Sequence, residues 1–260
     1  MYGFCPLASG SKGNCIYIGT KQAKILIDAG LSAKAIQQRL EAINVDIADI
    51  DAIVITHEHG DHIKGLRVLS CRKGIPVFTN SDTAKAIYHS LQECPKFKIF
   101  TTGETFEFAD MEIHPFSIQH DAVDPVAFVI QTGNLKLGFC ADLGFATTLV
   151  GAHLRDCDYL YLEANHEPAM VHACNRPMVY KQRVLSRQGH LSNEQCAALL
   201  KEVAHEGLKH VHLAHLSSEC NAPEKALNAA REALESSTGV EVALQDKPST
   251  LIFFNTILEK

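Results

Sequence analysis

Apolar and polar residues follow one another along the chain in short blocks that predict a mixed α/β structure. In the first third, runs rich in Ile and Val predict three buried strands, over residues 24–28, 52–56 and 75–79. Helical spacing predicts helices over residues 32–43 and 82–91, the first of them begun by Ser32 as N-cap. A further helix is expected from about residue 63.

The pattern changes between residues 98 and 142, where strands follow one another with only short turns. We expect strands over residues 105–108, 111–119, 126–132 and 135–141, with Gly133-Asn134 as the tight hairpin between the last two. The last third alternates again, with strands over 159–163, 210–214 and 240–244 and helices over 192–205 and 223–235. Ser192 and Gln195 form a capping box at the first of these helices.

This order of elements fits a two-layered sheet core that is covered by helices on both outer faces. Periodicity alone does not distinguish that architecture from a doubly wound sheet. No run rich in Pro, Gly or Ser divides the 260 residues, so a single domain spanning residues 1–260 is expected.

Composition and charge limit the partners and the compartment. No apolar stretch approaches the roughly 20 residues of a membrane span, and the N-terminus lacks the features of a signal peptide. The nine cysteines contain no Cys-x-x-Cys pair, which favours a reducing cytoplasm over a disulfide framework. The net charge of −6 argues against a nucleic acid held by electrostatics alone, although Lys181, Arg183 and Arg187 form a local basic patch.

The densest chemistry lies in His57-Glu-His-Gly-Asp-His62, which directly follows a predicted strand. Three imidazoles and two carboxylates within six residues suit divalent metals such as zinc, manganese or iron. Three further polar side chains stand where other predicted strands end: His120, Asp142 and His215. A carboxylate in such a place is costly when it is buried unpaired, so binding to a cation is a natural state for it.

Together these residues give seven potential ligands, in an order and context that resemble the metallo-β-lactamase superfamily. The resemblance runs from about Leu7 to the C-terminus and implies a four-layer αββα sandwich of two mixed β-sheets. It also implies two divalent metal ions, zinc or manganese, with Asp142 bridging them. The implied ligands are His57, His59 and His120 on one metal and Asp61, His62 and His215 on the other.

The segment Gly189-His-Leu-Ser192 resembles an element of ribonuclease Z and related phosphodiesterases. That resemblance gives His190 the role of proton donor or phosphate contact. Residues 8–14, 162–166 and 189–193 look more closely like the YycJ/WalJ group, whose members are described as 5′-to-3′ DNA exonucleases. The resemblance therefore implies a nucleic acid partner, with DNA preferred over RNA.

Several other residues are candidates for contact with substrate or for support of the ligands. Glu163 ends a predicted strand and is expected to orient a ligand histidine. The candidates for substrate binding are Ser9, Ser11, Asn14, Asn165, His166 and Ser192. None of the other histidines is expected to be catalytic, and most are expected to be surface residues or strand partners: His89, His114, His153, His172, His205, His210 and His212.

The favoured hypothesis is a phosphodiesterase in which two metals ionise a bridging water, with Asp61 and His190 as catalytic residues. One alternative is a metal-dependent thioesterase of the glyoxalase II type, or a lactonase, because these share the ligand set. The other is a regulatory binding protein without enzymatic activity. Activity on thioesters alone would favour the first alternative, and normal function without Asp142 would favour the second.

Overall fold

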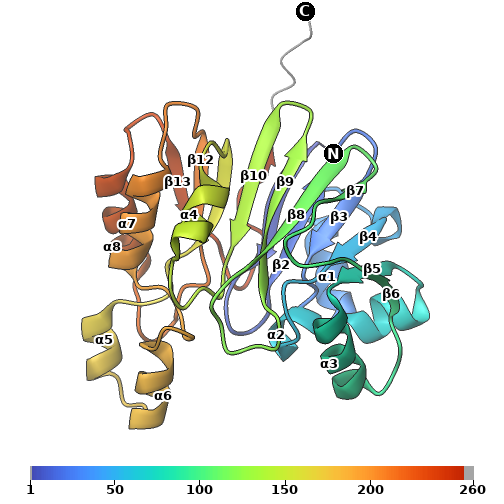
Figure 1. Ribbon diagram of the computed structural model, residues 1–260, viewed down its shortest axis with the longest axis horizontal. Coiled ribbons are helices and arrows are strands. Elements are labelled where there is room, and N and C mark those ends of the chain that lie inside the picture. Colours follow the sequence, from blue (N-terminus) through green and yellow to red (C-terminus); the bar gives the residue numbers. More distant parts are fainter. Residues whose placement is uncertain (1, 255–260) are drawn as a thin grey trace, which may run out of the picture. The chain divides into compact units, whose positions relative to one another are not determined.

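The computed structural model describes residues 2–254, which form two compact units (Figure 1). Among the described residues, unit 1 consists of residues 2–99 and 244–254, and unit 2 consists of Phe100–Ala243. Each unit contains one seven-stranded mixed sheet with helices packed on it. The single domain expected from the sequence stays a prediction.

The sheet of unit 1 has the strand order β14-β1-β2-β3-β4-β5-β6. The pairs from β14 to β3 are antiparallel and the pairs from β3 to β6 are parallel. Its strands are β1 (Gly3–Ala8), β2 (Cys15–Gly19), β3 (Lys24–Ile27), β4 (Ala52–Val54), β5 (Pro76–Thr79), β6 (Lys96–Ile99) and β14 (Ile252–Phe253). Its helices are α1 (Ala33–Glu41), the 3₁₀ turn η1 (Ile47–Asp49), α2 (Gly60–Ile63), the π-helical η2 (Arg67–Arg72) and α3 (Ser81–Leu91).

The sheet of unit 2 has the order β13-β12-β11-β10-β9-β8-β7, parallel from β13 to β10 and antiparallel from β10 to β7. Its strands are β7 (Phe106–Phe108), β8 (Met111–Ser117), β9 (Val126–Thr132), β10 (Leu135–Cys140), β11 (Tyr159–Glu163), β12 (His210–Ala214) and β13 (Gly239–Val242). Its helices are α4 (Thr148–Leu154), α5 (Pro168–Ala173), α6 (Met178–Val184), α7 (Asn193–Val203) and α8 (Pro223–Ala233).

One face of the unit 2 sheet is covered by α4, α7 and α8 (Figure 1). The apolar stripe of α7, which includes Leu199 and Leu200, packs in the same cluster as Leu160 and Val211 of the sheet. Ser192 accepts from Gln195 N–H while the Gln195 side chain accepts from Ser192 N–H, so the predicted capping box is confirmed. Helix α7 therefore has a defined start, directly after His190 and Leu191.

The predicted hairpin at Gly133-Asn134 is also confirmed, since Thr132 pairs with Leu135 across the turn. Several elements begin or end elsewhere than the sequence predicted. Helix α2 begins at Gly60 rather than near residue 63, because His59 already has the extended backbone of an N-cap residue. Strands β1 and β2, in which every residue is buried, lie on either side of the loop 9–14.

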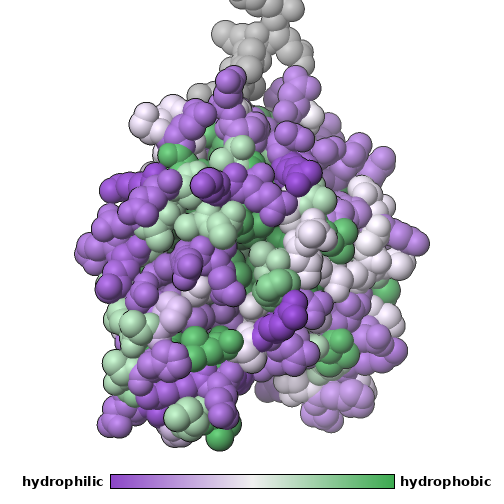
Figure 2. Space-filling model, turned by 60° about the vertical axis from the view of Figure 1, so that its left-hand side comes forward, coloured by the Kyte–Doolittle hydropathy of each residue, from purple (hydrophilic) through white to green (hydrophobic). Residues whose placement is uncertain are grey.

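Hydrophilic side chains cover most of the face that Figure 2 shows, with hydrophobic groups scattered between them. The most exposed large apolar side chains include Met178 and Val179 at the start of α6. Within residues 2–254, no helix combines the length and the hydrophobicity that a membrane span requires.

Candidate metal centre

Four potential ligands of unit 1 lie between the end of β4 and the end of α2. The ring of His57 lies 4.0 Å from that of His62 and 4.6 Å from that of His59, measured between centroids. Asp61 completes this group: its Oδ2 lies 3.7 Å from His62 Nε2. The side chains of His57 and His62 are almost fully buried, so the ring positions are held by surrounding protein.

Asp28 holds the His62 ring, and sequence reasoning missed this residue. Asp28 Oδ2 lies 2.7 Å from His62 Nδ1, and Asp28 Oδ1 accepts the Thr56 N–H at 2.9 Å. Because a carboxylate only accepts hydrogen bonds, it keeps the imidazole proton on Nδ1, so that Nε2 keeps the lone pair that a metal ion or a hydrogen-bond donor can use. The signal was present in the sequence, since Asp28 follows an apolar strand in the same way as Asp142.

The loop 9–14 contributes Asn14 to the same group. Asn14 Nδ2 lies 3.0 Å from His62 Nε2 and 3.3 Å from Asp61 Oδ2, and Asn14 N–H donates to Asp61 O. The chain at Gly30 passes so close that an added Cβ would lie 1.6 Å from Asp61 O, so only glycine fits there. Ser9 is buried and Ser11 is exposed, and among the loop's predicted residues it is Asn14 that contacts the ligands.

The predicted ligands of unit 2 meet because neighbouring parallel strands end at the same edge of their sheet. Asp142 follows β10, Glu163 is the last residue of β11 and His215 follows β12. Strand β8, which precedes His120, runs in the same direction as β10 because both pair antiparallel with β9. Asp142 Oδ1 lies 3.5 Å from His215 Nδ1, 3.7 Å from His190 Nδ1 and 3.9 Å from His120 Nε2.

Glu163 contacts two histidines of this group. Its Oε1 lies 2.8 Å from His190 Nδ1 and 3.1 Å from His215 Nδ1, while its Oε2 accepts the N–H groups of Leu143 and Leu191. Burial opposes ionisation of this fully buried carboxyl group, yet the charge of His190 and the hydrogen bonds of both histidines outweigh it and lower its pKa. Glu163 therefore binds both rings through Nδ1, which leaves each Nε2 for another partner.

Asp28, Asp142 and His215 all have left-handed backbone, with φ of 60°, 55° and 54°. Non-glycine residues seldom adopt this conformation, and when they do they are concentrated at functional sites. In each case the residue stands just after a strand, where the turn of the chain aims the side chain across the end of the sheet. The sequence pattern carried no sign of this conformation.

The remaining predicted residues of unit 2 lie around His190. Asn165 Nδ2 donates to the backbone oxygen of His215 at 2.6 Å, so this side chain supports a ligand. His166 and Ser192 line a pocket of about 390 Å³ together with His190. Burial lowers the pKa of His166 to about 4, so its ring is neutral at physiological pH.

The predicted basic patch is partly neutralised within unit 2. Arg183 forms a two-point ion pair with Asp121, with an Nε–Oδ2 distance of 2.6 Å, and the guanidinium of Arg187 lies 4.1 Å from the centre of the Phe145 ring. Asp121 Oδ1 is also 3.2 Å from His120 Nε2. Helix α6 is therefore tied to the residue that follows a predicted ligand.

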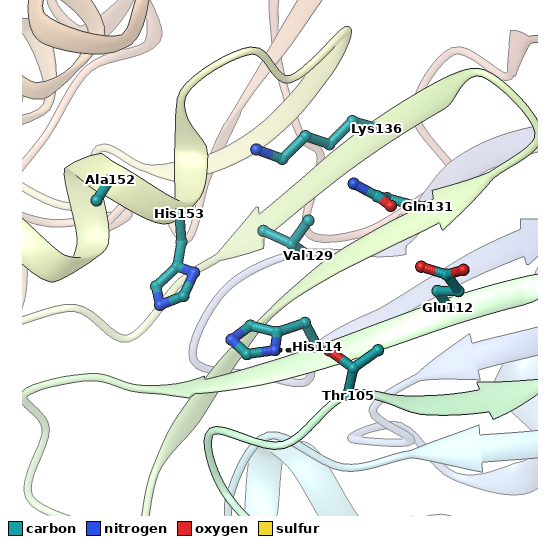
Figure 3. Close-up of a pocket in the computed structure, with 8 residues that line it drawn as sticks. All are labelled: Thr105, Glu112, His114, Val129, Gln131, Lys136, Ala152 and His153. Atoms are coloured by element: carbon teal, nitrogen blue, oxygen red, sulfur yellow. Dashed lines mark hydrogen bonds between the residues drawn. The ribbon is translucent and has the colours of Figure 1, made fainter.

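A separate pocket of about 260 Å³ lies beside β8, β9 and α4 (Figure 3). His114 and His153 line it with their rings 4.7 Å apart, and Thr105 Oγ1 lies 3.0 Å from His114 Nδ1. Burial lowers the pKa of both histidines, so both are neutral at physiological pH. None of the predicted site residues lines this pocket.

These features place the chain in a known class of proteins. A family profile described as β-lactamase superfamily domain matches residues 23–213, and the chain belongs to that superfamily. This confirms two predictions: the metallo-β-lactamase fold, with two mixed sheets and flanking helices, and the assignment of the chain as a hydrolase.

Two relatives are similar over most of their length. The chain is 37% identical over 235 residues to Exodeoxyribonuclease YycJ of Bacillus anthracis, covering 89% of both chains. It is 37% identical over 224 residues to Exodeoxyribonuclease WalJ of Streptococcus pneumoniae, covering 85% of this chain and 83% of the relative. The predicted resemblance to the YycJ/WalJ group is therefore confirmed.

Solved structures with low sequence identity share the fold. The metallo-β-lactamase fold protein YhfI from Bacillus subtilis superimposes with a TM-score of 0.72 at 16% identity, covering 95% of this chain and 98% of that one. Zinc-bound PqqB from Methylobacterium extorquens gives a TM-score of 0.70 at 16% identity, covering 95% and 99%.

Proposed function

We propose that this chain is a metal-dependent nuclease that removes nucleotides from DNA in the 5′-to-3′ direction. The observation that carries the proposal is the 37% identity, over 89% of both chains, to a protein named exodeoxyribonuclease. The donor chemistry supports it, because an imidazole lies beside a carboxylate in each unit, His62 beside Asp61 in unit 1 and His215 beside Asp142 in unit 2.

The seven predicted ligands are proposed to hold two divalent metal ions jointly, as the family resemblance implies. His57, His59 and His120 would bind one ion, Asp61, His62 and His215 the other, and Asp142 would bridge them. The tautomers support this assignment, since Asp28 and Glu163 bind Nδ1 of His62 and His215 and leave Nε2 as the donor atom. When bound, such ions activate water as a nucleophile and neutralise the charge that develops on a phosphate.

His190 is the residue proposed to act on the leaving oxygen. Its Nδ1–H donates to Glu163 at 2.8 Å, and its ring is partly exposed in the 390 Å³ pocket. A protonated Nε2 on this ring could then give its proton to the departing nucleotide oxygen. The same pocket, with His166 and Ser192, is proposed to receive the terminal nucleotide. Asn14 and Asn165 are proposed to position His62 and His215.

The test is degradation of a 5′-phosphorylated, 5′-labelled DNA duplex in the presence of manganese. A 5′-to-3′ exonuclease releases labelled mononucleotide from the first turnover, whereas a 3′-to-5′ exonuclease produces a ladder of shortened labelled strands. Absence of any cleavage by metal-loaded protein would count against DNA, and RNA ends and thioesters would then be tested in that order.

The matched variants are Asp142→Asn and Asp156→Asn. Asp142 has φ 55° and Asp156 has φ 60°, so asparagine is tolerated at both. Asp156 is exposed and belongs to none of the groups of potential metal ligands. Asp142→Asn is expected to abolish cleavage while Asp156→Asn retains it. His190→Ala is expected to keep its metal and to slow turnover by about 10² to 10⁴-fold, the usual contribution of a general acid.

A further inference from the structure

Three side chains outside both ligand groups meet where β12 pairs with β13. His210 and His212 lie two residues apart on β12, so their side chains point to the same face of the sheet. Glu241 on β13 is the direct neighbour of His212 in the parallel register. One nitrogen of each ring and one carboxylate oxygen all lie within 4.8 Å of one another.

The distances suit a shared cation. His212 Nε2 lies 2.6 Å and His210 Nε2 lies 3.7 Å from Glu241 Oε1, and the two ring centroids are 4.7 Å apart. A tetrahedral zinc ion with bonds of about 2.0–2.1 Å keeps its ligand atoms roughly 3.3 Å apart. The three donor atoms are therefore already close to a coordinating arrangement, and small rotations of the side chains would complete it.

The surroundings favour a cation over a simple ion pair. An ion pair between His212 and Glu241 needs no second imidazole, yet His210 Nε2 is buried and has no hydrogen-bond partner among residues 2–254. Gly239, the neighbour of His210 in the register, makes room for the ring, since an added Cβ would lie 2.5 Å from His210 Nδ1. The side chains of His210 and Glu241 are 16% and 29% exposed, which gives an ion a path from solvent.

We propose that His210, His212 and Glu241 form an additional site for a divalent cation of the zinc type, separate from the proposed hydrolytic centre. Two imidazoles and a carboxylate are an established ligand set for zinc, with a water molecule in the fourth position. Strand β13 is the edge of the unit 2 sheet and is only partly buried. The ion would tie this edge strand to β12 and so stabilise the strand that leads to His215.

The test is the number of zinc ions bound by the full chain after stripping with a chelator, reloading and gel filtration, measured by elemental analysis. Glu241→Gln and His210→Gln are each expected to bind about one zinc ion fewer per chain than the wild type, because each removes one ligand. His89→Gln is the matched control, since His89 is an exposed histidine on α3, and it is expected to bind as much as the wild type.

Equal zinc content in Glu241→Gln, His210→Gln and His89→Gln would overturn the proposal. The two substitutions are tested separately, because either alone could alter folding, and circular dichroism verifies that each variant is folded. The comparison is repeated in an Asp142→Asn background. If Glu241→Gln and His210→Gln still bind about one zinc ion fewer in that background, the additional site is supported independently of whether the chain cleaves DNA.

Discussion

Replacing Asp28 with asparagine tests how the chain sets the donor atom of His62. Asp28 Oδ1 accepts the Thr56 N–H at 2.9 Å, so the asparagine carbonyl oxygen is expected to stay in that position. The amide nitrogen then takes the place of Oδ2, which lies 2.7 Å from His62 Nδ1. Since an amide nitrogen donates, it favours the tautomer with the proton on Nε2, which is the wrong tautomer for a metal ligand.

The expected loss follows from the role of such partners. Replacing a group that orients a metal-bound histidine commonly costs about 10- to 100-fold in metal affinity. That range corresponds to about 1.4–2.8 kcal/mol, since each 1.4 kcal/mol is a factor of ten. Asparagine is chosen over alanine because Asp28 has φ 60°, a conformation that asparagine adopts more readily. The fold should therefore survive the change.

The assay is competition for zinc between the protein and a chromophoric chelator, with the fold monitored by circular dichroism. The matched control is Asp49→Asn, which also removes a paired carboxylate from unit 1, but one that forms a surface ion pair of 2.6 Å with Lys24. Such a surface pair contributes about 0–1 kcal/mol to stability, and it orients no predicted metal ligand. If Asp28→Asn binds zinc as tightly as Asp49→Asn, the proposed orientation of His62 is wrong.

Three other changes have defined outcomes. Glu163→Gln should lower the rate of DNA cleavage by about 10- to 100-fold, because one carboxylate contacts both His190 and a ligand histidine; an unchanged rate would contradict this. Iodoacetamide at pH 8 should modify the exposed Cys94 rapidly but spare Cys140, whose pKa is raised by burial. Mass spectrometry of the native protein measures both modifications, and equal rates at the two thiols would refute this. Ser192→Ala should lower the free energy of unfolding in urea by about 1 kcal/mol through loss of the α7 cap, so an unchanged midpoint would refute the role of the capping box.

The sequence by itself was sufficient for the local features. The strand before His57, the hairpin at Gly133 and the capping box at Ser192 depend on residues a few positions apart, so their patterns survive in one dimension. The ligand set could also be proposed from the sequence, because a carboxylate buried without a partner is costly, and it stays a prediction. The family resemblance then assigned the fold and the class of chemistry.

Only the tertiary structure decided which groups hold those ligands. Asp28 is 34 residues from His62, and Glu163 is 52 residues from His215, so no periodic pattern connects either pair. They meet because strand order brings the carboxyl ends of neighbouring parallel strands to one edge, and strand order is a long-range property of the sheet. The left-handed backbone of Asp142 and His215 is likewise imposed by the packed turn after each strand, because a non-glycine residue adopts that conformation only rarely by itself.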